Sequence, residues 1–143
     1  MQGLELCRRY FYECALPLLQ SDFPELLENA AFGLVGEGSE CLLLDDGISR
    51  DHDFEPGFCI WLTESAMREH ELDYRRFYNS LPKEFMGFKK SVMSPAGGKR
   101  HGVLGIDDFY SRLLGAGDWE TENPSLEQWL YLPGSAFLSC SNG

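Results

Sequence analysis

The sequence predicts an α+β domain in which a small β-sheet is flanked by α-helices. Three short apolar runs, at 31–35, 58–62 and 103–106, are typical of buried strands. Two longer stretches, 4–19 and 64–79, place apolar residues at helical spacing. A chain of 143 residues with 43% hydrophobic residues is long enough to bury a substantial core. We therefore expect residues 1–143 to form a single domain.

The N-terminal part is predicted to be helical. The 4–19 stretch has one apolar face, and Pro17 is expected to disturb its final turn. A second short helix is predicted over 23–29, with Asp22 as its N-cap and Pro24 in its first turn. Both helices are expected to pack on the sheet.

The strand at 31–35 leads into a glycine-rich turn, Gly36 to Ser39, whose backbone N–H groups could approach phosphate oxygens closely. Asp51 and Asp53 follow on a second extended segment. Side chains two apart on a strand share a face, so these carboxylates project together and His52 points away. Paired carboxylates repel unless a cation lies between them, and they suit Mg²⁺ or Mn²⁺. The alternative is a solvated aspartate-rich turn.

The middle of the chain continues this pattern of strand and helix. The segment 55–57 breaks the extended chain. Residues 58–62 are apolar on both faces, which is typical of a central strand covered on both sides. Thr63 is the predicted N-cap of the helix over 64–79, whose exposed face is rich in charged residues.

The segment from 81 to 102 is predicted to be irregular. Residues 81–85 resemble a linker, and 88–102 form the most basic part of the chain. Lys99 and Arg100 follow a Gly-Gly pair and are candidates for binding a triphosphate. A plain hairpin loop that balances an acidic surface is an equally good interpretation.

The C-terminal part contains one more candidate acid. Asp107 lies at the end of the predicted strand over 103–106 and is either a catalytic carboxylate or a residue of a helix N-terminus. Short helices are predicted over 109–114 and 124–130. The tail 137–143 is expected to have no closing element.

Composition excludes several classes of protein. A net charge of −11 argues against a sequence-independent nucleic-acid binder and is compatible with a small-molecule or protein partner. The five cysteines lie in apolar contexts without metal-ligand spacing, as expected for reduced thiols in a cytoplasmic protein. We expect no secretory signal and no membrane span.

The Gly-Ser turn, the spacer and the Asp-x-Asp strand together resemble the nucleotidyltransferase superfamily of the DNA polymerase beta type. A closer resemblance is to a bacterial family of unknown function within it, carried by Gly-Glu-Gly-Ser-Glu-Cys, Ser-Arg-Asp-His-Asp-Phe and Pro-Gly-Phe-Cys-x-Trp-Leu. It is tight over 36–62 and loose over 4–129. The resemblance implies a small mixed sheet flanked by helices, and a chain that is either a short member or a fragment lacking a C-terminal helical extension.

The resemblance also implies a reaction: attack of an acceptor hydroxyl on the α-phosphorus of a nucleoside triphosphate. Asp51 and Asp53 would hold the metal, and Gly38, Ser39 and Ser49 would serve the nucleotide. In the superfamily a third carboxylate helps to deprotonate the hydroxyl, and the strand at 103–106 has none, with Asp107 the nearest candidate. The acceptor, the preferred base and the oligomeric state are not readable from the sequence.

Two competing functions share this fold. One is a catalytically weak or inactive module that binds a nucleotide or a partner, favoured by the missing strand carboxylate. The other is one half of a toxin–antitoxin-like pair. Pyrophosphate release, tight binding without turnover, and stable co-purification with one protein distinguish the three.

Overall fold

The structure is a computed structural model that describes residues 3–36, 41, 55–90, 101–114, 125–131 and 134–142. The predicted α+β class is confirmed. The helices are α1 (Gly3–Tyr10), α2 (Leu16–Asp22), α3 (Glu64–Ser80), α4 (Ile106–Leu114), α5 (Leu126–Tyr131) and α6 (Gly134–Ser141), with a π-helix η1 (Phe11–Ala15) and a 3-10 helix η2 (Pro24–Leu27). The strands are β1 (Ala31–Gly33), β2 (Cys59–Leu62), β3 (Glu84–Phe85), β4 (Phe88–Lys89) and β5 (Gly102–Gly105).

Three of these strands form one mixed sheet in the order β1-β2-β5. Strands β1 and β2 are antiparallel, with Gly33 opposite Cys59. Strands β2 and β5 are parallel, with Cys59 opposite Gly102. The predicted central strand is confirmed, because β2 has a neighbour on each side and all four of its residues are buried.

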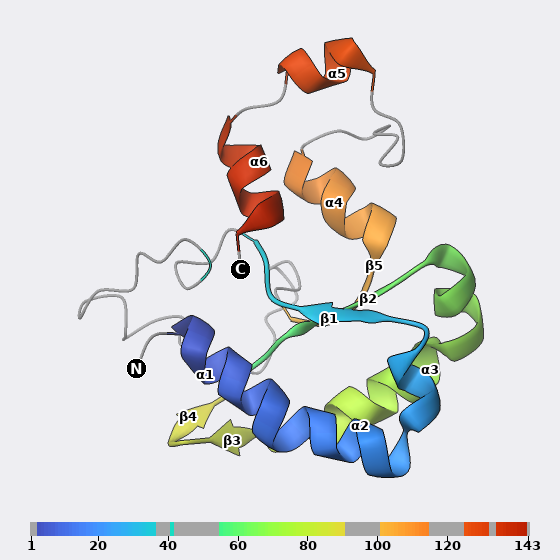
Figure 1. Cartoon of the computed structure of the whole chain (residues 1–143), viewed down its shortest axis with the longest axis vertical. Coiled ribbons are helices and arrows are strands. Elements are labelled where there is room, and N and C mark those ends of the chain that lie inside the picture. Colours follow the sequence, from blue (N-terminus) through green and yellow to red (C-terminus); the bar gives the residue numbers. More distant parts are fainter. Residues whose placement is uncertain are drawn as a thin grey trace.

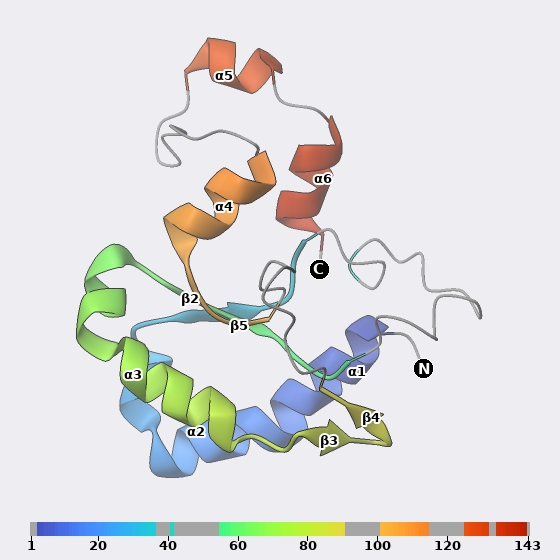
Figure 2. The same cartoon turned by 180° about the vertical axis from the view of Figure 1, so that it is seen from behind.

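Helices cover both faces of this sheet (Figures 1 and 2). On one face, Ile60 and Leu62 join a large core with residues of α1, α2 and α3. On the other face, Cys59 and Trp61 pack with Phe109 of α4, and the Trp61 and Phe109 rings meet edge to face at 5.4 Å. The alternation of side chains along β2 therefore assigns one helical layer to each face.

The N-terminal helix is longer than predicted and contains Pro17 without ending there. It runs from Gly3 to Asp22, and the Leu16 N–H bonds to the carbonyl of Phe11, five residues back. A proline in a helix lacks its N–H and its ring crowds the carbonyl four residues earlier. The wider π turn just before Pro17 relieves that crowding, so the helix continues.

Two N-terminal predictions were wrong. The predicted helix over 23–29 is a 3-10 turn, and its N-cap is Phe23 without a side-chain cap, because Asp22 still belongs to α2. Tyr74 donates a buried hydrogen bond of 2.7 Å to the Leu26 carbonyl. That carbonyl is thereby bound by a side chain rather than by a continuing helix.

Three predictions in the second half also needed correction. The predicted linker at 81–85 contains β3, which pairs with β4 across Met86 and Gly87, both at positive φ as a tight hairpin requires. Helix α4 begins at Ile106 rather than 109, with Asp107 and Asp108 in its first turn. The tail expected to lack a closing element forms α6, which packs against α4.

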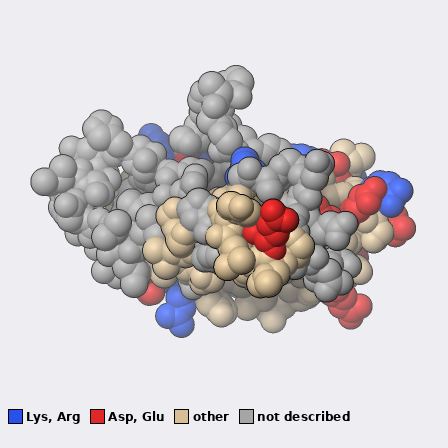
Figure 3. Space-filling view, turned by 90° about the horizontal axis from the view of Figure 1, so that it is seen from above, with Lys and Arg blue, Asp and Glu red and all other residues tan. Residues whose placement is uncertain are grey.

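Helix α5 lies at the far end of the molecule from α1 (Figure 1). Leu126, Leu130 and Tyr131 expose 75%, 75% and 80% of their surface. Viewed onto this end, uncharged residues gather around an acidic side chain (Figure 3). Within the described residues, no helix is both long and apolar enough to span a membrane.

Candidate functional site

Most of the site residues predicted from the sequence lie outside the described residues. These are Gly38, Ser39, Ser49, Asp51, Asp53, Lys99 and Arg100. The described residues that flank them in the sequence are Gly36, Cys41, Glu55, Lys90 and His101. The site is therefore built here from these flanking residues.

The flanking residues meet at one end of the sheet. Because β1 and β2 are antiparallel, the end of β1 and the start of β2 lie together. Because β5 runs parallel to β2, its start lies there as well, and the Gly102 N–H donates a hydrogen bond of 2.8 Å to the Phe58 carbonyl. We call this the entry end, formed by Gly33–Gly36, by 55–59 and by 101–102. The segments that carry the two sequence motifs both join the fold at the entry end.

Glu55 and His101 face each other at the entry end. Glu55 Oε1 lies 3.4 Å from His101 Nδ1, and the two side chains are 23% and 10% exposed. A Cβ added to Gly57 would lie 2.4 Å from His101 Nδ1. The imidazole therefore packs directly on the backbone of residue 57, where only glycine leaves room for it.

Lys90 is a half-buried cation beside this pair. Its Nζ lies 4.1 Å from the centre of the Tyr78 ring and 4.7 Å from that of Tyr10. Burial lowers the pKa of Lys90 to about 8, against a smaller opposing effect of Glu55. Burial also raises the pKa of Tyr78, which keeps its hydroxyl neutral. Two aromatic faces and one carboxylate thus hold a desolvated amine at the entry end.

The thiols at this end are chemically quiet. Cys7, Cys41 and Cys59 are buried, and none of the five cysteines, all of which are described, forms a disulfide. Burial raises the pKa of Cys59 to about 12, with smaller contributions from Cys41 and Cys7. A thiol with so high a pKa is protonated near neutral pH and is a poor nucleophile or metal ligand. These cysteines behave as small hydrophobic residues, as the sequence predicts.

The C-terminal helix reaches the entry end as well. The Gly36 N–H donates to Asn142 Oδ1 at 3.4 Å, across 106 positions of sequence. Gly36 has a φ of 144°, which favours glycine. Asn142 thus binds the last described residue before the predicted phosphate-binding turn.

Asp107 lies at the opposite end of β5. It is exposed in the first turn of α4, after the strand ends at Gly105. We call this the exit end, formed by 62–63 of β2 and its helix cap and by 105–108. The sequence left a catalytic carboxylate and a helix N-terminal residue as alternatives for Asp107. Its location favours the second, because it is separated from the entry end by the length of the strand.

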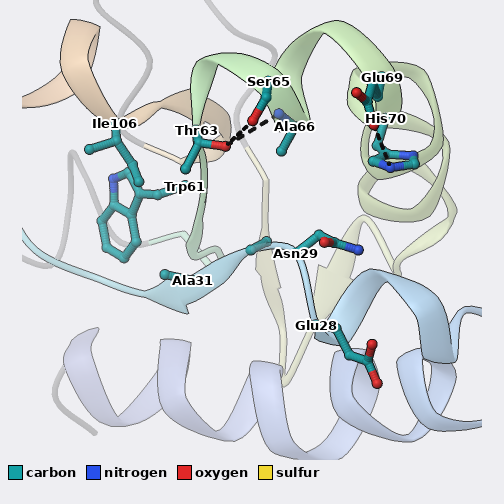
Figure 4. A pocket seen from close by; sticks show the side chains of 11 residues that line it. Glu28, Asn29, Ala31, Trp61, Thr63, Ser65, Ala66, Glu69, His70 and Ile106 are labelled. Carbon is teal, nitrogen blue, oxygen red and sulfur yellow. Dashed lines mark hydrogen bonds and ion pairs between the residues drawn. The ribbon is translucent and has the colours of Figure 1, made fainter.

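An open pocket of about 440 Å³ also lies towards the exit end. Figure 4 shows Asn29 and Ala31 on one side, Ser65 and His70 of α3 on another, and Trp61 at its end. Thr63, which caps α3 by accepting from the Ala66 N–H at 3.3 Å as predicted, is part of its wall. None of the residues predicted for the site lines this pocket.

Sequence reasoning missed the functional interest of Glu55, Lys90 and His101. Glu55 was recognised only as part of a strand break, and the other two only as parts of a basic segment. A carboxylate before one strand and a histidine before the next, with a glycine between them, was the available signal. Among the described residues, no cluster of three or more His, Cys, Asp or Glu side chains could hold a metal.

The chain matches no protein-family model, and searches of curated proteins and solved structures return no significant match.

Proposed function

We propose that the chain is a nucleotidyltransferase that moves a nucleoside monophosphate from a nucleoside triphosphate to a hydroxyl of a small molecule or protein. The observation that supports this most is the meeting of β1, β2 and β5 at the entry end. The Gly-Ser turn follows β1, the Asp-x-Asp segment precedes β2, and the basic segment precedes β5. A phosphate-binding turn, paired carboxylates and cations joined to one end of a sheet are what this reaction needs.

The residues would divide the work by their chemistry. Asp51 and Asp53 would hold Mg²⁺ or Mn²⁺, which when bound would neutralise phosphate charge. Backbone N–H groups at Gly38 and the hydroxyls of Ser39 and Ser49 would donate to phosphate oxygens. Lys99 and Arg100 would add positive charge. With a net charge of −11, the protein favours a cationic or neutral acceptor over a nucleic acid.

A second candidate is a module that binds a nucleotide or a partner without turnover. It is favoured by one observation. Strand β5 carries no carboxylate, and Asp107, the nearest acid, is exposed at the exit end. On this alternative the entry end would bind Mg-nucleotide tightly and release no pyrophosphate.

Calorimetric titration of the four nucleoside triphosphates, with and without Mg²⁺, tests the proposal. Wild type is compared with Asp53→Asn and with Asp73→Asn, a matched change on α3 whose side chain is 52% exposed. We expect binding that requires both Mg²⁺ and Asp53 and is unchanged in Asp73→Asn. Release of pyrophosphate from the tightest-binding nucleotide then separates the enzyme from the binding module.

Two outcomes contradict the proposal. If no nucleotide binds to the wild type under either condition, the site assignment is wrong. Equal affinities of wild type and Asp53→Asn would remove Asp53 from the site, whatever the activity.

A further inference from the structure

His101 has one ring nitrogen committed and the other available. Its Nδ1 faces Glu55 at 3.4 Å. Its Nε2 is buried and has no hydrogen-bond partner among the residues that the structure describes. A buried ring nitrogen without a partner is costly unless it serves a ligand or a reaction.

The ring is also held in place from several directions. Gly57 packs on it so closely that a Cβ there would lie 2.4 Å from Nδ1. The next residue, Gly102, is paired to Phe58 through a hydrogen bond of 2.8 Å. A surface histidine would not need a neighbouring glycine and a parallel strand to fix its position. This one is fixed at the start of β5, beside the start of β2.

The charged and titratable groups around the imidazole come from each neighbouring element. They are Glu55 before β2, Lys90 after β4, Tyr78 of α3, whose ring would touch a Cβ at Gly102, and Cys7 of α1, whose thiol donates to the Glu55 carbonyl at 3.5 Å. Tyr78 and Cys7 are neutral near pH 7. Glu55 is therefore the group that orients the ring, and Lys90 is the cation that balances Glu55.

We propose that His101 is the general base of the transfer reaction and that Glu55 is its positioning residue. This inference rests on the proposed function and replaces the carboxylate that β5 lacks. With the Nδ1 proton directed at Glu55, the imidazole is neutral and presents the Nε2 lone pair. This is the same division of roles that a carboxylate and a histidine have in acid–base catalysis elsewhere.

The step balances as follows. The acceptor oxygen forms a bond to the α-phosphorus as its proton passes to His101 Nε2. The bond between the α-phosphorus and the oxygen bridging to the β-phosphate breaks, and pyrophosphate leaves with that electron pair. The imidazolium, stabilised by Glu55, then returns its proton to water.

The first test separates binding from proton transfer. His101→Asn and a matched control, His70→Asn on α3, are compared with wild type, using the tightest-binding Mg-nucleotide and either water or glycerol as acceptor. We expect His101→Asn to bind the nucleotide within about threefold of wild type and to release pyrophosphate roughly 10²- to 10⁴-fold more slowly. The wild-type rate should fall towards acid pH as the base is protonated, and that acid limb should be absent in His101→Asn. His70→Asn should behave like wild type.

The outcomes distinguish this inference from the proposed function. If wild type turns over and His101→Asn does so within a few-fold with the same pH profile, the enzyme stands and the histidine assignment falls. A wild type that binds Mg-nucleotide but releases no pyrophosphate overturns both the transfer reaction and the role of His101.

A second measurement needs no activity and covers the case in which His101→Asn folds poorly. Nitrogen-15 chemical shifts of the histidines report the imidazole tautomer directly. We expect His101 in wild type to carry its proton on Nδ1, and Glu55→Gln to reduce that preference. A proton on Nε2 in wild type would leave no lone pair for the acceptor and would overturn the proposal.

Discussion

The two ends of the β2–β5 strand pair are built from different chemistry. At the entry end, Glu55, Lys90 and His101 are half-buried or buried and are packed on glycine and aromatic rings. At the exit end, Thr63 caps α3, and Asp107 and Asp108 occupy the first turn of α4 in solvent. Exposed acids at helix N-termini stabilise helices, whereas desolvated polar groups cost stability and are kept for binding or chemistry. The contrast identifies the entry end as the functional one.

Substitution of Gly57 should break the entry end most severely. In Gly57→Ala the new Cβ would lie 2.4 Å from His101 Nδ1, so the ring or the strand must move. We expect the free energy of unfolding to fall by about 1–3 kcal/mol, as in other overpacked sites, and nucleotide turnover to be lost. Gly134→Ala is the control, because its Cβ would meet nothing within 4 Å. Chemical denaturation of both variants measures this, and wild-type stability in Gly57→Ala would contradict the close packing of His101.

Lys90 should give the entry end a characteristic pH dependence. Its pKa in the folded protein, about 8, lies below the value of 10.5 for an exposed lysine. Between these values the unfolded chain binds more protons, so stability should rise with pH. We expect wild type to gain about 1 kcal/mol relative to Lys90→Met between pH 8 and 9.5.

Denaturant unfolding at a series of pH values tests this. Below pH 8 the difference between the two proteins should be constant, because Lys90 is then protonated in both states. Parallel stability curves across the whole range would show that Lys90 is not desolvated. The measurement stays below pH 10, where the tyrosines begin to titrate.

Asp107 should have the smallest effect, and it sharpens the comparison from the other end. Asp107→Asn removes a charge from the first turn of α4, so we expect a loss of roughly 0.3–1 kcal/mol in stability. Nucleotide affinity and pyrophosphate release should not change. Thr63→Ala, which removes the cap of α3, should likewise cost about 1 kcal/mol and leave nucleotide binding intact. Loss of turnover in Asp107→Asn with unchanged stability would return this residue to the catalytic site.

Elements with strong local signals were predictable from the sequence. Helix α3 has a Thr63 cap and a long amphipathic run, and β2 is an uninterrupted apolar segment. Helix α6 was not predictable, because Gly134, the serines and the absence of charge give it little intrinsic helix preference. Its packing against α4 supplies what local propensity does not. The β3–β4 hairpin was missed because its strands have only two residues each.

The candidate site was less accessible to sequence reasoning than the fold. The sequence identifies residue types and spacing at Asp51 and Asp53, but it does not say which distant segment joins the fold beside them. Only the parallel register of β5 with β2 brings His101 next to the segment that follows Asp53. Asp107 was considered as the missing acid because it is near in sequence to β5, yet the strand carries it to the opposite end.

The contact between Gly57 and His101 has a consequence for the evolution of this chain. Two positions far apart in sequence share one volume, so neither is free to change alone. Among homologous sequences we expect them to covary: a side chain at position 57 should appear only where position 101 holds a residue smaller than histidine. Such lineages would have given up the imidazole, and with it the base proposed here. The residue at position 57 would then serve as a marker that separates active from inactive members.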